Sequence, residues 1–470
     1  MANVEPKVLR GFRDFMPGEM IARGKIINKI KEIYESYGFV PLATPALEYK
    51  EILLGYGSEA SKQIYSFRDP EDNEVGLRFD LTVPLARVIS QHKDLPRPFK
   101  RYQIQPVWRY DKPDPGRFRE FIQFDIDTVG TDSMVADAEI VSAMYDCLNE
   151  LGLNFKIRFS NRKVLNSLLV FASIDTKLAH SVFRVMDKLE KHGLENVRLE
   201  LGPGRVDDSG TEILGLGLKD DQIAKIEVFL NLSQGTRHQA IDSLKELFRD
   251  TPGSEEGISE LEEIHKYLKA VGVPDEKAAI DLSIARGLDY YTGPVFEAIL
   301  LDAPRFGSVM GGGRFDKLIG VFVEEEIPAT GASIGVDRLL SAMKHLEKIE
   351  MRSSVADILI TVMVPNRLAG YLEIAKELRA AGFKAELYMG KERSISKQLK
   401  YADRQGIPLA IIIGPDEFEK NEVSIKDLRG LEQKTEKIPS RVEWIKSKPG
   451  QVTLSRKDLL ASVSAILTGL

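Results

Sequence analysis

The stretch Phe99–Gly130, FKRYQIQPVWRYDKPDPGRFREFIQFDIDTVG, decides the fold that this sequence predicts. Tyr102, Ile104, Pro106 and Trp108 recur at every second position, and Phe121, Phe124 and Ile126 line a second run that closes the stretch, so each run predicts a β-strand. Between the runs, Asp111–Gly116 holds two prolines and a glycine, which cannot continue a strand and therefore predict a turn. The stretch is expected to form an antiparallel hairpin.

The returning strand of this hairpin has a polar face. Gln123, Asp125 and Asp127 are spaced two residues apart, so they project from one side, with apolar residues mostly on the other. Burying such a face is costly unless a ligand or water satisfies its polar groups. The face is therefore either a binding site or the solvated side of an ordinary sheet, and the hairpin alone leaves both interpretations open.

Composition limits the class of protein. At 470 residues the chain is long enough for two or three domains. Its 43% hydrophobic and 29% charged residues are typical of a soluble globular protein. A single cysteine, Cys147, excludes internal disulfides and is consistent with a reducing compartment. The N-terminus has no apolar secretory stretch and no apolar run could span a bilayer, so we expect a cytoplasmic protein without membrane segments.

The charge of the chain is unevenly distributed. The formal net charge of −6 argues against wholesale nucleic-acid binding. From Met351 onward, however, there are 20 Lys and Arg against 15 Asp and Glu, a charge of +5, while the first 350 residues hold 45 against 56, a charge of −11. A basic terminal region on an acidic body could meet a phosphate backbone locally. Ordinary scatter of surface charge would produce the same numbers.

Periodicity divides the chain into parts. Residues 1–350 mix strands with helices, but about 161–255 consists of helical segments with little strand character and predicts a helical insertion. After Ser353, strands and helices alternate, which predicts a small α/β domain over 355–470 with right-handed crossovers. Near the start of the chain, Phe39–Leu47 carries two prolines that cannot donate to a ladder, so it suits an edge or intersubunit position.

Two separated stretches offer groups for binding an amino acid or a phosphate. Gly76–Leu85 (GLRFDLTVPL) alternates like a strand that Pro84 ends, and its Asp80 and Thr82 would share one face fit to hold an ammonium group. Arg109 offers a planar fork for phosphate or carboxylate.

Further candidates each have a structural alternative. Arg286 lies beside a carboxylate and the tyrosine pair Tyr290–Tyr291 in one tight turn, but it could form a structural ion pair while the tyrosines fill a core. Arg338 lies in a predicted helix, where a lone arginine is most often solvated. The glycine-rich stretches at Gly311–Gly313 and 328–335 are predicted as turns, the commoner use of glycine. No Ser–His, Cys–His or ligand-spaced Cys/His cluster suggests covalent hydrolysis or structural zinc, and metal-binding residues stay unknown.

Together these stretches resemble the histidyl-tRNA synthetase family of class II aminoacyl-tRNA synthetases, over essentially the whole chain. The resemblance implies an α+β fold, with a class II antiparallel-sheet catalytic core flanked by helices in residues 1–350 and an anticodon-binding-type α/β domain in residues 355–470. The stretches that carry it are RGFRDFMPGE (Arg10–Glu19), FDLTVPLAR (Phe79–Arg87), the hairpin, ARGLDYYTG (Ala285–Gly293), GSVMGGGRFDKL (Gly307–Leu318) and GASIGVDRL (Gly331–Leu339).

The resemblance implies an ATP- and Mg²⁺-dependent histidine–tRNA ligase. Histidine would attack the α-phosphorus of ATP, and the 3′ end of tRNA(His) would then take the activated carboxyl. Pro45, in the segment similar to the first class II motif, implies a homodimer. The alternative is a catalytically silent paralogue that regulates ATP phosphoribosyltransferase in histidine biosynthesis. Such paralogues typically lack the tail domain and have a degraded RGLDYY signature, both of which this chain retains.

The resemblance also implies roles for single residues. Arg109 and Arg286 would act as the catalytic pair on opposite sides of the α-phosphate, and Arg338 would stack on adenine or touch the γ-phosphate, with Mg²⁺ bridging the β- and γ-phosphates. Asp127 would accept the imidazole N–H, helped by a tyrosine hydroxyl, which selects histidine over apolar amino acids. The residues implied to bind histidine are Asp80, Leu81, Thr82, Gln123, Asp127, Tyr290 and Tyr291.

Overall fold

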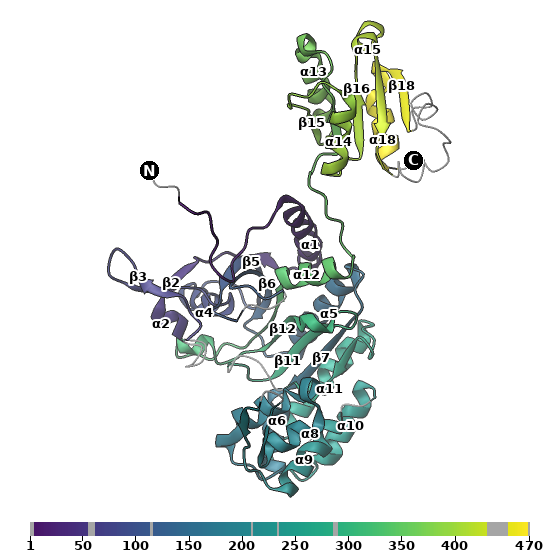
Figure 1. Ribbon diagram of the computed structural model, residues 1–470. Coiled ribbons are helices and arrows are strands. Elements are labelled where there is room, and N and C mark those ends of the chain that lie inside the picture. Colours follow the sequence, from purple (N-terminus) through teal and green to yellow (C-terminus); the bar gives the residue numbers. More distant parts are fainter. Residues whose placement is uncertain are drawn as a thin grey trace. The chain divides into compact units, whose positions relative to one another are not determined.

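The computed structural model has the mixed α+β architecture that the sequence predicts, and helices and strands follow one another along the whole chain (Figure 1). It divides into two compact units, Met1–Arg13 with Lys25–Lys348 and Asp14–Gly24 with Ile349–Leu470. No helix of the described residues is long and apolar enough to cross a membrane. The structure describes residues 4–54, 62–112, 116–207, 210–232, 235–284, 290–429 and 450–468.

The first unit is built on one eight-stranded sheet with the strand order β1-β5-β6-β13-β12-β11-β7-β10. Neighbouring strands from β5 to β7 are antiparallel, and the two edge strands, β1 and β10, pair in parallel with their neighbours. In that order the strands span Val40–Pro41, Phe99–Trp108, Glu120–Val129, Ala329–Gly335, Ser308–Arg314, Pro294–Leu300, Phe155–Asn161 and Ala278–Ile280.

The hairpin predicted from Phe99–Gly130 is present as β5 and β6. The two strands pair over ten residues, from Phe99 opposite Val129 to Trp108 opposite Glu120. The alternation of the sequence separates the two faces of β6, because Phe124 and Ile126 are fully buried on the side away from the polar residues. The ring of Phe124 meets the edge of Tyr34, 4.9 Å between centroids, on the helix α1 (Pro17–Ser36).

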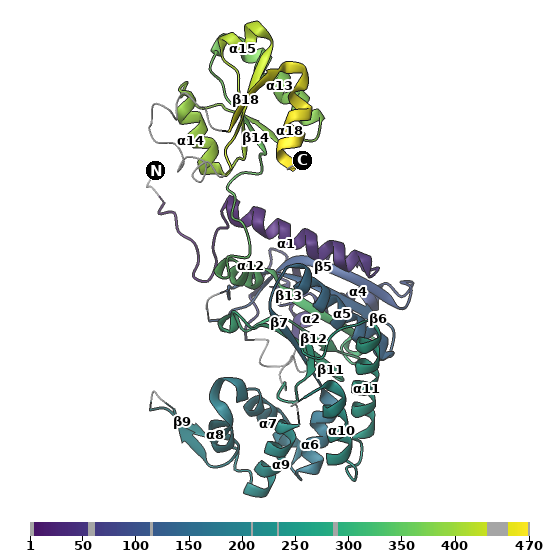
Figure 2. The same cartoon turned by 90° about the vertical axis from the view of Figure 1, so that its right-hand side faces the viewer.

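Helices cover the apolar face of the sheet. Figure 2 shows α1 lying along β5, and Tyr102 of β5 donates to Glu35 of α1 at 2.9 Å. Helix α5 (Met134–Glu150) crosses the central strands, where its buried Asp137 pairs with Arg314 at the end of β12. Helix α12 (Val336–His345) follows β13 directly and packs on β6, β12 and β13.

Between β7 and β10 the chain is mostly helical. In both views these helices gather below the sheet (teal in Figures 1 and 2). The last of them, α11, packs on α5 and β7 and so joins the layer that covers the sheet. A small hairpin of β8 (Gly204–Val206) and β9 (Glu212–Leu214) interrupts the helices and has no counterpart in the sequence-based prediction. The helices are α6 (Arg162–Phe171), α7 (Ala179–Met186), α8 (Leu189–Leu201), α9 (Asp220–Asn231), α10 (Arg237–Leu247) and α11 (Glu255–Ala270).

The predicted strand at Gly76–Leu85 is wrong beyond its first residues. Strand β4 (Glu74–Leu77) ends there, and helix α4 (Thr82–Gln91) begins before Pro84. The side chain of Asp80 decides this, because its Oδ1 accepts the first two backbone N–H groups of the helix at 2.9 and 3.1 Å. Pro84 therefore lies in the first turn of a helix, where its missing N–H needs no partner.

A separate three-stranded sheet has the order β2-β4-β3, with β2 at Leu47–Tyr49 and β3 at Ser66–Arg68. The segment predicted as one strand, Phe39–Leu47, is divided between two sheets: Val40–Pro41 forms β1 and Leu47 begins β2. Its predicted edge position is confirmed, because β1 is the outermost strand of the large sheet.

The second unit contains a five-stranded sheet with the order β15-β14-β16-β17-β18. Its first three strands are parallel and alternate with helices in the chain, as the sequence predicts, while β17 and β18 add antiparallel strands. The strands are β14 (Ile358–Ile360), β15 (Ala385–Leu387), β16 (Leu409–Ile412), β17 (Glu422–Asp427) and β18 (Gln451–Ser455). The helices are α13 (Leu368–Ala380), α14 (Ile395–Gln405), α15 (Pro415–Lys420) and α18 (Leu459–Thr468).

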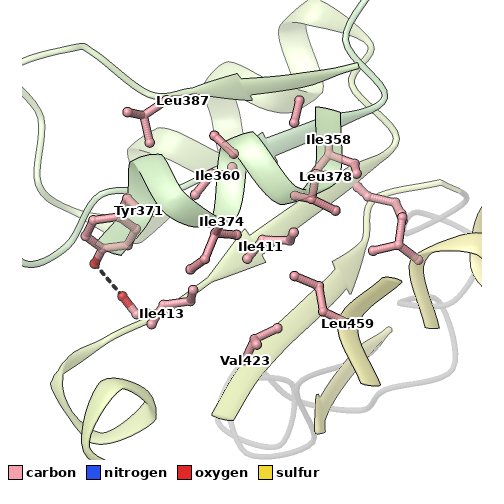
Figure 3. Packing of buried hydrophobic residues seen from close by; sticks show 14 of the residues in the cluster. Ile358, Ile360, Tyr371, Ile374, Leu378, Leu387, Ile411, Ile413, Val423 and Leu459 are labelled. Atoms are coloured by element: carbon pink, nitrogen blue, oxygen red, sulfur yellow. Dashed lines mark hydrogen bonds between the residues drawn. The ribbon is translucent and has the colours of Figure 1, made fainter. Parts of the chain in front are cut away.

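A buried tyrosine ties the core of the second unit together. Tyr371 of α13 is fully buried among Ile360, Ile374 and their neighbours (Figure 3). Its hydroxyl donates to the carbonyl of Ile413 at 2.6 Å and accepts the backbone N–H groups of residues 363 and 364, both at 3.2 Å. One hydroxyl thus satisfies three backbone groups where β14 and β16 end.

We expect Tyr371→Phe to destabilise the second unit by about 1–3 kcal/mol, because it leaves buried backbone groups without partners. Hydrogen exchange of the β14 and β16 amides in the full chain measures this. Tyr401→Phe is the matched control, since it removes one hydrogen bond to the half-buried carboxylate of Glu386, 2.7 Å away, and should cost less than half as much. Equal exchange rates in wild type and Tyr371→Phe would contradict this role.

Candidate active site

A cavity of about 290 Å³ lies on the polar face of the large sheet. Strands β6, β11, β12 and β13 contribute to its lining, together with the turn before α4, the first residues of α12 and the hairpin turn after β5. The cavity brings together most of the residues that the sequence predicts for the site. Those that line it are Asp80, Thr82, Arg109, Gln123, Asp127, Tyr290, Tyr291 and Arg338.

Two residues predicted for the site are not among those that line the cavity. The side chain of Leu81 is fully buried and is not part of the lining, although its carbonyl accepts from Arg101 Nη2 at 3.2 Å. Arg286, predicted as a catalytic and ATP-binding residue, lies outside the residues that the structure describes.

Strand register explains why these side chains meet. Asp127 of β6 lies opposite Arg101 of β5 on one side and opposite Gly331 of β13 on the other. Two residues along β6, Asp125 lies opposite Ser333 in the same way. Because side chains alternate in direction along each strand, these rows share the face of the sheet on which the cavity lies.

The glycine stretches predicted as turns are strands, which corrects that prediction. Gly311–Gly313 lies inside β12, and the second stretch forms β13. A Cβ on Gly331 would lie 2.1 Å from Asp127 Oδ1, and a Cβ on Gly313 would lie 2.9 Å from the ring of Tyr291. Glycine is required here because site side chains occupy the space directly above the sheet.

The acidic side of the cavity is buried and unbalanced in charge. Asp80, Asp125 and Asp127 are 2%, 2% and 3% exposed, and the fully buried Arg101 pairs with Asp127, with 2.7 Å between Nη2 and Oδ2. Burial raises the pKa of Asp125 and of Asp127 above the usual range of a carboxyl, and the charge of Arg101 opposes this rise. Three carboxylates around one guanidinium favour a cationic ligand group.

The basic side of the cavity lies at the turn end of the hairpin. Arg109 follows the last residue of β5, where its Nε donates to the carbonyl of Phe79 at 3.0 Å. Its guanidinium carbon lies 4.3 and 5.4 Å from the ring centroids of Phe79 and Phe121, so two aromatic faces hold it. Arg338 donates to the carbonyl of Ser308 at 2.6 Å, and the exposed Arg117 also lines this end. These arginines suit an anionic ligand group.

Two tyrosines form part of the wall. Tyr290 and Tyr291 meet edge to face, with 4.8 Å between ring centroids. Burial raises the pKa of Tyr291, and the charges of Asp80 and Asp127 add to the rise, so its hydroxyl keeps its proton at neutral pH. A protonated hydroxyl beside carboxylates can both donate and accept.

Sequence reasoning assigned no role to several residues that the structure brings to the site. Asp125 was visible on the polar face by its spacing, but spacing alone gave it no partner. Arg101 shares a face with the polar residues of β5, which is a usable signal in retrospect. Ser333 lay in a predicted turn. Glu297, buried on β11 with its carboxylate 3.4 Å from Arg158, lay in a run read only as apolar.

Sequence comparison identifies both parts of the chain. A family model described as "Histidyl-tRNA synthetase" matches residues 11–339. A second model, described as "Anticodon binding domain", matches residues 357–448.

Full-length relatives agree with these matches. The histidine–tRNA ligases of Ruegeria sp. (strain TM1040) and Paracoccus denitrificans (strain Pd 1222) are each 41% identical to this chain; the alignments cover 98% and 97% of it, and 96% and 97% of the relatives. Among solved structures, histidyl-tRNA synthetase from Nostoc sp. PCC 7120 has a TM-score of 0.82 at 32% identity, covering 98% of this chain and 99% of that one.

A further solved structure shares the fold. It is described as an ATP phosphoribosyltransferase regulatory subunit/histidyl-tRNA synthetase from Bacillus halodurans C. It has a TM-score of 0.69 at 23% identity and covers 84% of this chain and 97% of that one. At this identity the likeness concerns the fold alone.

The buried carboxyls predict a pH dependence of stability. The pKa of Asp125 is higher in the folded than in the unfolded chain, so its stabilising contribution is present below the unfolded pKa and lost as pH rises through the folded one. We compare the unfolding free energy of wild type with that of Asp125→Asn. The difference, wild type minus variant, should decrease as pH rises from about 4 to about 7. Denaturant unfolding at a series of pH values measures this difference.

Asp69 provides a control of opposite sign. Hydrogen bonds from Asn73 lower the pKa of Asp69, so the difference between wild type and Asp69→Asn should rise with pH over the acidic range. If the Asp125→Asn difference also rose with pH, Arg101 would outweigh burial, and the electrostatic account of the cavity would be wrong.

Proposed function

The chain belongs to the histidyl-tRNA synthetase family, and from that membership we propose how its cavity carries out the two steps of histidine–tRNA ligation. The enzyme activates L-histidine with ATP, giving histidyl-adenylate and pyrophosphate, and then transfers the histidyl group to the 3′ end of tRNA(His). One observation supports this most directly. The cavity has buried carboxylates at one end and arginines at the other, which matches the ammonium and imidazole N–H groups of histidine beside an anionic nucleotide.

Histidine binds at the acidic side of the cavity in this proposal. Gln123 Nε2 donates to Ser333 Oγ at 2.8 Å, while Gln123 Oε1 is buried without a hydrogen-bond partner, so this oxygen can accept from the α-ammonium group. Asp80 and Thr82 complete the ammonium site. Leu81, whose side chain is buried, contributes by holding the turn that carries them.

The imidazole ring binds Asp127 in this proposal, with the hydroxyl of Tyr290 or Tyr291 as a second partner. An apolar amino acid of similar size would leave the carboxylate of Asp127 buried without the N–H that it requires. Selection for histidine therefore comes from the cost of an unmet polar group rather than from shape alone.

Adenylate formation takes place at the basic side. A carboxylate oxygen of histidine attacks the α-phosphorus, and the bond from that phosphorus to the bridging oxygen breaks, so pyrophosphate leaves with the electron pair. Arg109 and Arg286 stabilise the charge that develops on the α-phosphate, and Arg338 binds the adenine or the γ-phosphate. For Arg286 the proposal rests on its motif alone, since it lies outside the described residues.

Mg²⁺ enters with ATP as part of the nucleotide substrate in this proposal. Within the described ranges, no three His, Cys, Asp or Glu side chains gather as a metal site. This ion commonly relies on substrate phosphates plus one or two carboxylates, and it would offset the phosphate charge there.

Transfer to tRNA would use both parts of the chain. A ribose hydroxyl at the 3′ end attacks the carbonyl carbon of the adenylate, and AMP leaves. We assign catalysis to residues 1–350, with the hairpin turn beside the acceptor end, and anticodon contact to residues 355–470, a region with an excess of basic residues. The alternative, a silent regulator of ATP phosphoribosyltransferase, is set aside because relatives aligned over nearly the whole chain are described as ligases.

The test is ATP–pyrophosphate exchange that requires histidine, followed by charging of total tRNA. Two substitutions should then give opposite defects. Asp127→Ala should raise KM for histidine at least tenfold and change KM for ATP little, because only the imidazole needs that acceptor. Arg338→Ala should raise KM for ATP more than KM for histidine. Equal effects of either variant on both substrates would remove that residue from its assigned role.

A homodimer is the second part of the proposal. On one face of the small sheet, Tyr49 and Phe67 lie on either side of Val75, and Leu47 lies beside them. Three apolar residues of these strands are largely exposed to solvent. They are Leu47, Tyr49 and Phe67, at 45%, 55% and 49%. An exposed apolar face on a small open sheet suits a second copy of the chain.

We expect the double substitution Leu47→Asp/Phe67→Asp to weaken dimerisation at least tenfold, or by about 1.4 kcal/mol, because each buries a charge in the proposed interface. Sedimentation equilibrium measures the dissociation constant. Leu214→Asp is the control, since Leu214 is 82% exposed on the distant β8–β9 hairpin and should leave dimerisation unchanged. A wild-type monomer at micromolar concentration would refute the homodimer.

A further inference from the structure

Arg101 is a fully buried arginine one strand away from the cavity and is not part of its lining. Its guanidinium joins two parts of the histidine site. One nitrogen, Nη2, lies 2.7 Å from Asp127 Oδ2 and donates to the carbonyl of Leu81 at 3.2 Å. The other, Nη1, donates to Gln103 Oε1 at 3.1 Å. A single planar group therefore connects β6 with the turn that precedes α4.

The guanidinium is held in place from behind. Gln103 is itself fully buried, and its Nε2 donates to Thr44 Oγ1 at 2.9 Å. Rotating Arg101 would break this chain as well as the pair with Asp127. The contacts of Arg101 thus fix the distance and the angle between the Asp127 carboxylate and the Asp80-Leu81-Thr82 turn.

We propose that Arg101 is the positioning residue of the histidine site, setting the separation at which the imidazole and the α-ammonium of one histidine molecule are recognised. The inference rests on the histidine-binding residues assigned under the proposed function. The two hydrogen-bond donors of histidine, its α-ammonium and its imidazole N–H, are joined by a few covalent bonds, so their acceptors must be held at one separation. A planar guanidinium can hold two acceptors in fixed directions, whereas a lysine ammonium cannot.

Arg101 also sets the charge of the site. Asp125 and Asp127 face Arg101 from β6, and Asp80 faces them from the turn before α4. Tyr291 lies close enough for their charges to raise its pKa, and Tyr34, which packs on the other face of β6, feels the charges of Asp125 and Asp127 as well. Burial raises the pKa of Asp125 and of Asp127 and the charge of Arg101 opposes this rise, so without Arg101 these two carboxyls would hold their protons to higher pH. A protonated carboxyl cannot pair with a cation, so histidine binding would weaken at neutral pH and recover as pH rises.

Three variants separate geometry from charge. Arg101→Met removes both, and should raise KM for histidine roughly 30-fold or more at neutral pH, with KM for ATP changed less than about threefold. That defect should shrink between about pH 7 and about pH 9. Arg101→Lys keeps the charge, so it should keep the wild-type pH profile with KM for histidine still raised on the order of tenfold. Arg101→Met/Asp125→Asn removes one carboxyl, and should move the pH profile back toward wild type without restoring KM.

Arg78→Met is the matched control for loss of a buried arginine. Arg78 is as deeply buried, but it donates to the carbonyls of Thr44 and Pro106, at 2.7 and 2.8 Å, rather than to a site carboxylate. Its loss should lower the melting temperature without raising KM for histidine more than KM for ATP. The substrate's own ionisation is common to all variants, so differences from wild type report on the protein.

The same assays contain the outcomes that overturn the inference. A folded Arg101→Lys or Arg101→Met/Asp125→Asn enzyme with wild-type KM for histidine overturns it, and so does an equal rise of KM for ATP. These two variants decide the matter if Arg101→Met fails to fold. Wild-type protein without histidine-dependent exchange would overturn the proposed function and this inference with it, whereas the variant results overturn this inference alone.

Discussion

Carboxylates buried on the central strand β6 are the constraint on which the rest of the site depends. An isolated ionised carboxylate is far too costly to bury, so each must be paired, protonated or matched by a ligand. The structure does this with one guanidinium, from Arg101 on the neighbouring strand, which pairs with Asp127. The negative charge that Arg101 does not balance faces the cavity, where a cationic ligand group can bind it.

The same register that places the carboxylates builds the core. Phe124 and Ile126 alternate with Asp125 and Asp127 along β6, so the packing of one face fixes the position of the other. A slip of one residue would bury the carboxylates among apolar side chains and expose the core. Hydrophobic packing on α1 and α5 therefore holds the cavity wall in register. In the proposed mechanism, substrate selection at this wall therefore depends on core residues that do not contact the substrate.

The elements predicted correctly from the sequence are those that a local pattern of residues determines. The hairpin and the parallel part of the second unit follow from periodicity. Both prolines of the turn predicted at Asp111–Gly116 lie outside the described residues. The prediction of a strand over Gly76–Leu85 failed because the side chain of Asp80 caps a helix, and the alternating pattern of the sequence gives no sign of that helix. The prediction of turns at the glycine stretches failed for a tertiary reason. Glycine is needed there because a side chain would clash with a residue of another strand, as a Cβ on Gly331 would with Asp127, and no local pattern contains that contact. The role of Arg101 likewise depends on a contact between strands rather than on its neighbours in sequence.

The separation of charge across the cavity orients the substrates in the proposed mechanism. The aspartates line the middle of β6 and the arginines lie at the hairpin turn, and the sheet keeps the two groups apart. The described contacts of Arg109 are with a carbonyl and two aromatic rings, which fix its position without neutralising its charge. A histidine whose ammonium and imidazole bind the aspartates must direct its carboxylate toward those arginines. The nucleophilic oxygen is then brought to the α-phosphate that the arginines bind, so recognition of the amino acid and alignment for attack are the same event.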